Sequence, residues 1–134
     1  MNAIVEQMYN GDEFSQWLGI RRIAEGAGHC TMEMTVRQEM VNGFGIAHGA
    51  ITYALADSAL AFASNAHGRK SVSIETSINH LKPVKPGDVL TAIAEEISLS
   101  HKLGIYNIRV LRGADLVGLF KGIVYRKEDT WEVT

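Results

Sequence analysis

The sequence predicts an α+β fold in which one antiparallel sheet curls around one long buried helix. Three observations predict it: an apolar run over residues 49–66, strand-like patterns before and after it, and the absence of any repeat or linker dividing the 134 residues. A helix that is apolar nearly all round must be covered on most of its sides. One sheet packed on one buried helix gives a layered α+β architecture, and we expect a single domain over residues 1–134.

Short helices and a hairpin are expected before the long helix. Apolar residues at helical spacing predict one or two helices, over residues 3–9 and 12–18. The segment "CTMEMTVR" alternates between apolar and polar residues, which predicts a half-buried strand. Its apolar face carries Cys30, Met32, Met34 and Val36. The preceding "GIRRIAE" is expected to pair with it, turning at residues 26–28.

A glycine-rich loop over residues 41–49 leads into the long helix, for which Gly68 is the expected C-terminal cap. After the helix, runs rich in Val, Ile, Leu and Thr predict strands, because these residues suit a pleated, half-buried surface. The turns between them are "PVKPGD", "SHKL" and "RGAD". We expect four strands, at about residues 71–82, 88–99, 103–112 and 115–126.

Composition excludes several classes of protein. A formal net charge of −2 and an isoelectric point near 6.2 argue against nucleic acid or an anionic membrane as the main partner. Cys30 is the only cysteine, so we expect no internal disulfide, and no Cys/His spacing predicts a metal site. The first residues do not resemble a signal peptide, and Asp57 makes the apolar run costly to place in a bilayer. We therefore expect a cytoplasmic protein.

Asp57 is the only charged residue between Gly49 and Ala66. A lone acid in a helix often lies on a solvent-facing side, but the helical neighbours of Asp57 are apolar or aromatic. An unpaired buried charge is costly, so a buried carboxylate needs a partner or a function. Burial would also raise its pKa, which suits a general base.

The start of the long helix is a second candidate site. The first backbone N–H groups of a helix, here from Gly49 onward, have no partner inside it. Together with the helix dipole they favour negative charge, and they could stabilise a developing oxyanion. Asn42 and His48 lie just before this point. The alternatives are that His48 caps or orients the helix and that Asn42 is an ordinary Asn-Gly turn residue.

Spacing separates these two sites within one chain. Asp57 lies eight residues after Gly49, which is about 12 Å along a helix axis. Both groups cannot hold the same atom at that distance. If the helices of two subunits lie antiparallel, Asp57 of one subunit faces Asn42, His48 and Gly49 of the other. This geometry predicts an obligate dimer with two equivalent sites.

The segment "NGFGIAHGAITYALADSALAFA" resembles the signature of hotdog-fold acyl-CoA thioesterases of the phenylacetic acid degradation (PaaI-like) type. In that family an Asn-Gly loop leads to His-Gly-Gly, and an Asp follows in the central helix. The later "INHLKPVKPGDVLTAIAEEI" and "GIYNIRVLRGADLVGLFKGIVYR" also resemble the family, so the likeness covers about residues 14–127. It implies a central helix wrapped by a curved antiparallel sheet of five to six strands, paired into homodimers that often form homotetramers.

The resemblance also implies an activity, the hydrolysis of acyl- or aryl-CoA thioesters to free acid and CoA. CoA is then part of the substrate, and no cofactor or metal is expected. By position, Asp57 matches the general base or nucleophile, Gly49 the backbone oxyanion donor, and Asn42 a side chain that helps hold the carbonyl. His48 matches the residue beside them, and Ser73 matches a position that helps place the attacking water in some members.

One residue departs from the family pattern, because Ala50 stands where the second Gly of His-Gly-Gly is expected. This should leave the Gly49 amide intact but could narrow the pocket. For the nucleotide end of CoA, the candidates are Lys102 with His101, and more weakly Lys85 and Arg69. Each could equally be a solvated surface charge.

The sequence is also compatible with two other functions. One is a hotdog hydratase or dehydratase acting on enoyl- or hydroxyacyl-thioesters, although the segment typical of hydratases is absent. The other is a non-catalytic acyl-CoA-binding protein, which would normally carry an effector domain that 134 residues leave no room for.

Overall fold

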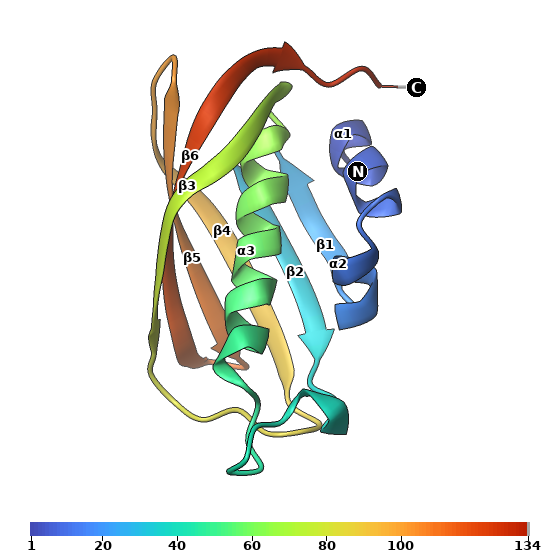
Figure 1. Cartoon of the computed structure of the whole chain (residues 1–134), viewed down its shortest axis with the longest axis vertical. Coiled ribbons are helices and arrows are strands. Elements are labelled where there is room, and N and C mark those ends of the chain that lie inside the picture. Colours follow the sequence, from blue (N-terminus) through green and yellow to red (C-terminus); the bar gives the residue numbers. More distant parts are fainter. Residues whose placement is uncertain (134) are drawn as a thin grey trace.

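A computed structural model, which describes residues 1–133, contains one six-stranded antiparallel sheet curved around helix α3 (Gly49–Asn65) (Figure 1). The strands run in the order β1-β2-β4-β5-β6-β3, so β1 and β3 form the two edges. The predicted α+β architecture is thus confirmed. The strands are β1 (Arg21–Gly26), β2 (His29–Thr35), β3 (Arg69–His80), β4 (Val89–Leu99), β5 (Leu103–Arg112) and β6 (Asp115–Thr130).

The two short helices before the sheet are those predicted. They are α1 (Ala3–Asn10) and α2 (Glu13–Leu18). Asn2 caps α1 by accepting the Ile4 N–H at 2.9 Å, as a short polar side chain does at a helix start. Figure 1 shows both helices on one side of α3, so α3 has the sheet behind it and these helices beside it.

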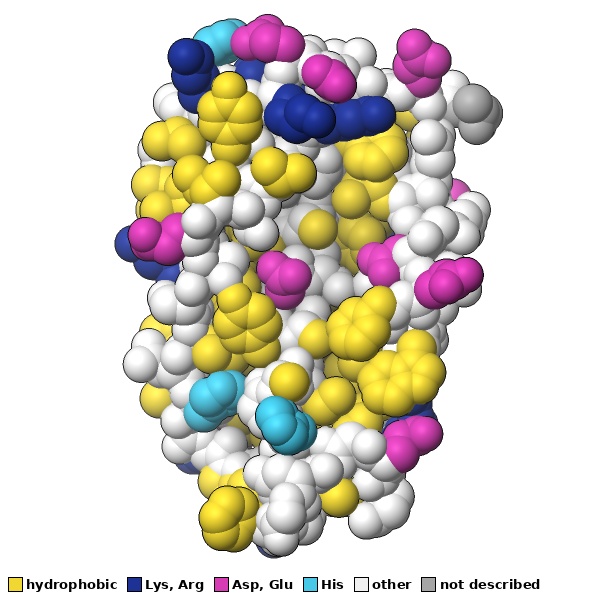
Figure 2. Space-filling view, viewed as in Figure 1, with side chains coloured by type: hydrophobic (Ala, Val, Ile, Leu, Met, Phe, Trp, Pro, Cys, Tyr) yellow, Lys and Arg dark blue, Asp and Glu magenta, His cyan; other side chains and the backbone are white. Residues whose placement is uncertain are grey.

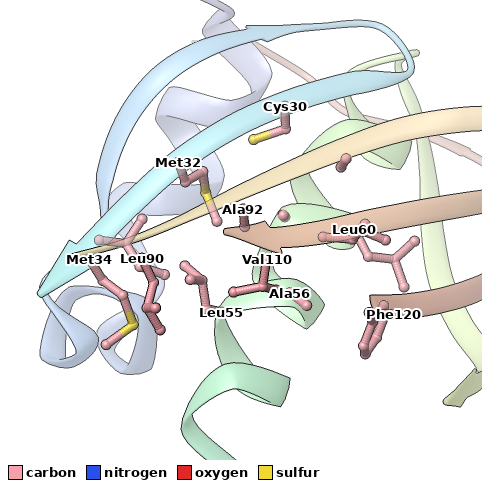
Figure 3. Close-up of a cluster of buried hydrophobic side chains, with 14 of the residues drawn as sticks. Cys30, Met32, Met34, Leu55, Ala56, Leu60, Leu90, Ala92, Val110 and Phe120 are labelled. Atoms are coloured by element: carbon pink, nitrogen blue, oxygen red, sulfur yellow. The ribbon is translucent and has the colours of Figure 1, made fainter. Parts of the chain in front are cut away.

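The core lies between α3 and the concave face of the sheet (Figure 3). The alternating face predicted for β2 is buried there: Cys30, Met32, Met34 and Val36 are each at most 2% exposed. Leu55 and Leu60 of α3 face this layer. A side chain at Gly122 of β6 would place its Cβ 2.5 Å from the Leu60 side chain, so glycine allows the helix to approach the sheet closely.

The end of α3 differs from the prediction. Ala66, not Gly68, is the C-terminal cap, and its N–H donates to the Phe62 carbonyl at 3.1 Å. Gly68 instead has φ +110° in the turn into β3, where its N–H donates to Asn65 O at 2.9 Å. The Asn65 side chain bonds both the N–H and the carbonyl of Ser71, which fixes the direction in which β3 leaves.

Two further details were absent from the sequence prediction. Strand β6 continues to Thr130, four residues beyond the predicted end at 126, because Thr130 pairs with Arg69 at the start of β3. A short 3-10 helix, Gln38–Met40, precedes the glycine-rich loop. Within residues 1–133, no helix is both long and apolar enough to cross a bilayer.

Candidate active site

Backbone hydrogen bonds hold the loop over residues 41–48 in place at the start of α3. The Asn42 N–H donates to Ile46 O at 2.8 Å, which closes the loop on itself. The Ala47 N–H donates to Val84 O at 2.7 Å, and the His48 N–H donates to Met40 O at 2.9 Å. The loop is therefore anchored to the segment before β4, and Asn42 and Gly49 have fixed positions.

A cleft of about 330 Å³ opens where α3 begins, and we call it the helix-start cleft. The Gly49 N–H finds no acceptor within residues 1–133. Asn42 Oδ1 accepts the Phe44 N–H at 2.9 Å, so its Nδ2 hydrogens remain available to a ligand. The cleft is lined by Asn42, Ile46, Ala47, Gly49, Thr52, His80, Leu81, Lys82, Pro83, Val84 and Val117.

These two donors suit a carbonyl oxygen. Both the Gly49 N–H and the Asn42 amide can donate, and the positive end of the α3 dipole favours charge that develops on the oxygen. The walls around them, from Ile46 to Val117, are mostly apolar. Excluding water from such walls strengthens the electrostatic interaction of an oxyanion with its donors.

His48 caps the helix, as the alternative interpretation of the sequence held. Its Nδ1 accepts the Ala50 N–H at 3.0 Å, so that nitrogen carries no proton. The residue is exposed and does not line the helix-start cleft. Its interaction in this chain is structural, since it fixes the first turn of the helix that holds the Gly49 amide.

A second cleft, of about 270 Å³, lies between α3 and β3, and we call it the Asp57 cleft. Asp57 is half-buried, and its carboxylate has no hydrogen-bond or ion-pair partner among residues 1–133. Burial raises the pKa of Asp57 above its ordinary value. Ser73 shares this cleft. An unpaired, half-buried carboxylate of raised pKa beside a hydroxyl has the properties of a general base.

Within one chain, the predicted catalytic residues are thus divided between two clefts. Asn42 and Gly49 line the helix-start cleft, whereas Asp57 and Ser73 line the Asp57 cleft, and no residue lines both. A carbonyl carbon held at Gly49 is beyond the reach of Asp57 of the same chain. This separation is the one expected from the eight-residue spacing.

Sequence reasoning missed three polar residues of the helix-start cleft, Thr52, His80 and Lys82. The short turn between α3 and β3 could have indicated one of them, His80. Such a turn makes β3 run back along α3, so its last residue, His80, returns to the helix start. Lys82 Nζ lies 3.2 Å from the Asp115 carboxylate at the exposed rim.

The basic candidates for the nucleotide end of CoA lie at opposite ends of the molecule. Arg69, His101 and Lys102 gather beyond the C-terminal end of α3, where Figure 2 shows basic, acidic and histidine side chains together at the top. Lys85 lies in the turn before β4, near the helix start. His101 Nε2 is 3.2 Å from Glu128 Oε1, while the Lys102 side chain is exposed and has no side-chain partner within residues 1–133.

Arg69 is already engaged by the protein. Its guanidinium donates to the carbonyls of His101, Arg126 and Lys127 at 2.6–2.8 Å. These bonds tie the β4–β5 turn to β6 and leave few donors for a phosphate. We therefore do not include Arg69 among the residues proposed to contact the nucleotide end of CoA.

Replacing Arg69 by Met should accordingly reduce stability and not substrate affinity. The change leaves three carbonyls without their donor, and we expect a loss of about 1–3 kcal/mol in the free energy of unfolding. Urea denaturation measures this loss, and Lys102→Met is the matched control at the same end of the molecule. A rise in KM for an acyl-CoA with no loss of stability would contradict this role for Arg69.

Comparison with known proteins identifies the family. Residues 44–118 match the sequence profile of the thioesterase superfamily. The chain belongs to this superfamily. It is 35% identical to the acyl-coenzyme A thioesterase PaaI of Escherichia coli K12 over 89% of its length and 86% of that protein. A putative esterase of Archaeoglobus fulgidus is 36% identical over the whole chain and 88% of its own length.

The fold agrees with this thioesterase assignment. The solved structure of the E. coli PaaI protein from the phenylacetic acid degradation operon superposes with a TM-score of 0.91 at 33% identity. The superposition covers 96% of this chain and 97% of that one. The PaaI-like hotdog fold predicted from the sequence is therefore confirmed. The range matching the family profile contains Gly49, Asp57 and Ser73, and Asn42 lies two residues before it.

In this thioesterase, the single cysteine is not placed for nucleophilic chemistry. Cys30 is 1% exposed within the core, and burial raises the pKa of its thiol to about 12. A thiol that stays protonated near neutral pH and has no path to substrate cannot form an acyl-enzyme. This leaves Asp57 as the strongest candidate to activate a nucleophile.

Proposed function

We propose that this protein hydrolyses acyl- or aryl-CoA thioesters to a free acid and CoA. The observation that carries the proposal is the pair of unengaged donors, the Gly49 N–H and the Asn42 amide, in one cleft of a thioesterase-superfamily chain. Together they bind the thioester carbonyl oxygen and polarise it. Their interactions strengthen as the oxygen gains charge, which favours the transition state over the bound substrate.

Asp57 supplies the second part of the reaction, from a partner subunit. With the two α3 helices antiparallel, Asp57 of one chain faces Gly49 of the other, and two equivalent sites form across the dimer. The separation of the two clefts within one chain supports this arrangement. We expect a homodimer, with pairing of dimers into a homotetramer as the next level of assembly.

In the general-base route, Asp57 removes a proton from a water molecule that Ser73 helps to position. The resulting hydroxide attacks the carbonyl carbon. The raised pKa of Asp57 makes its carboxylate a stronger base for removing this proton. Direct attack by Asp57 would instead give a mixed anhydride. Single turnover in oxygen-18 water distinguishes the two, because only the anhydride route places the label in Asp57.

Lys102 and His101 are the proposed contacts for the nucleotide end of CoA. They lie beyond the C-terminal end of α3, and in an antiparallel pair this end approaches the helix start of the partner subunit. Lys85 lies at the helix start itself and is the alternative. The cytoplasmic location predicted from the sequence stays a prediction.

The test is a panel of short, medium, long and aromatic acyl-CoAs, with release of free CoA thiol recorded by a chromogenic disulfide. We expect turnover that continues over many cycles on at least one class of acyl group. Hydration of crotonyl-CoA, followed by its absorbance, would support a hydratase instead. Saturable binding of acyl-CoA without thiol release would support a non-catalytic binding protein.

A further inference from the structure

His80 lies against the proposed oxyanion site. A Cβ built on Gly49 would be 3.1 Å from His80 Nε2 and 3.2 Å from Cε1. The imidazole therefore packs on the α-carbon of Gly49, the atom next to the unengaged N–H. His80 is the last residue of β3 and lines the helix-start cleft.

The two ring nitrogens of His80 face different groups: Nδ1 contacts Thr52, and Nε2 is nearest Gly49. The Thr52 hydroxyl donates its only hydrogen to Gly49 O at 3.1 Å. His80 Nδ1 lies 3.3 Å from that hydroxyl oxygen. With the Thr52 hydrogen directed at Gly49 O, the oxygen accepts, and the His80 tautomer that completes this contact carries its proton on Nδ1. Nε2 is the nitrogen nearest Gly49, and it has no hydrogen-bond partner within residues 1–133. Thr52 is 5% exposed, so its hydroxyl contacts the His80 ring from the buried side of the cleft.

We propose that His80 is the catalytic acid that protonates the departing thiolate. The proposal rests on thioester hydrolysis as the function and names a residue for its last step. When the tetrahedral intermediate collapses, the carbon–sulfur bond breaks and its electron pair leaves on sulfur. The sulfur takes the proton from Nε2 of the imidazolium. The proton that Asp57 removed from water then passes through solvent to His80. The products are a carboxylic acid and a thiol, with no change in oxidation state.

Two features favour this role over a third hydrogen bond to the carbonyl oxygen. The Gly49 N–H and the Asn42 amide already provide two donors for that oxygen. Departure of the thiolate is the step that still lacks a proton donor, since Asp57 acts on the attacking water.

The test compares two thioesters of the same acid, one with CoA and one with thiophenol as leaving group. An aryl thiolate is a more stable anion than an alkyl thiolate, so it departs without a proton. His80→Gln keeps the size of the side chain and a donor for Thr52, but it cannot transfer a proton. We expect kcat/KM to fall about 10²-fold or more for the CoA thioester and less than about threefold for the thiophenyl ester.

Control variants make the outcome decisive. His48→Gln changes the other histidine at the helix start, and any loss it causes should be equal for both thioesters. His80→Ala should regain CoA thioester turnover when imidazole is added. An equal loss on both thioesters, or no loss, in His80→Gln would overturn this inference while thioester hydrolysis stood. A wild-type protein inactive on both thioesters and on the acyl-CoA panel would refute the proposed function as well.

Discussion

Asp57→Asn should lower kcat/KM for an acyl-CoA by about 10²–10⁴-fold, because an amide cannot take the proton of the attacking water. The variant keeps the size of the side chain, and Asp57 has no partner within residues 1–133 that the change would break. The oligomeric state should therefore not change. Thiol release measures the loss, and size-exclusion chromatography checks the assembly. Near-full activity would remove Asp57 from the mechanism.

The same variant should not be less stable at neutral pH. Burial raises the pKa of Asp57, so the folded state holds the proton more tightly than the unfolded state does. The ionised carboxylate then lowers the free energy of unfolding as the pH rises through the unfolded pKa, near 3.9, and on through the folded value. Asn carries no such penalty.

Urea denaturation at several pH values tests this sign. We expect Asp57→Asn to be at least as stable as the wild type at pH 7, with its advantage shrinking as the pH falls toward 4. A carboxylate that stabilised the fold through a hidden ion pair would give the opposite trend. Lost activity with retained or increased stability is the pattern of a residue kept for chemistry.

Mixing two inactive variants should restore activity if each site takes residues from two chains. In a heterodimer of Asp57→Asn with Asn42→Ala, one site combines the intact Asn42 of the first chain with the intact Asp57 of the second. The other site carries both substitutions. Random pairing makes half of the dimers mixed, each with one working site, so activity should recover to about one quarter of wild type.

This experiment separates the two-chain site from a site within one chain. If Asn42 and Asp57 of the same chain act together, every site in the mixture carries a substitution and activity stays at the level of the unmixed variants. The variants are unfolded together, refolded as a mixture, and assayed beside each variant refolded alone. The refolded wild type sets the full scale and accounts for losses caused by refolding itself.

Local patterns predicted most of the elements, because each depends on neighbours in the chain. The alternation in "CTMEMTVR" set the buried face of β2, and the apolar run set α3. The errors occurred where a distant segment decides the outcome. The charged residues 127–129 have no strand pattern of their own. They belong to β6 because the residues on either side of them, Arg126 and Thr130, pair with the start of β3.

Much of the candidate site also follows from the sequence alone. The unpaired Gly49 N–H is a property of any helix start, and the distance from Gly49 to Asp57 follows from the helical rise. The cleft that Asp57 shares with Ser73 needs the packing of β3 on α3. Arg69 could not be separated from the other basic candidates, because its three carbonyl partners lie 32 to 58 residues away.

We could predict from residue order the succession of the elements, the free amide at Gly49 and the acid two turns beyond it, since helical geometry depends only on neighbouring residues. The return of His80 to Gly49 and its contact with Thr52 exist only in the folded chain. Thr52 and His80 are 28 residues apart, and their contact depends on how β3 packs along α3. No local sequence pattern predicts how β3 is aligned along α3.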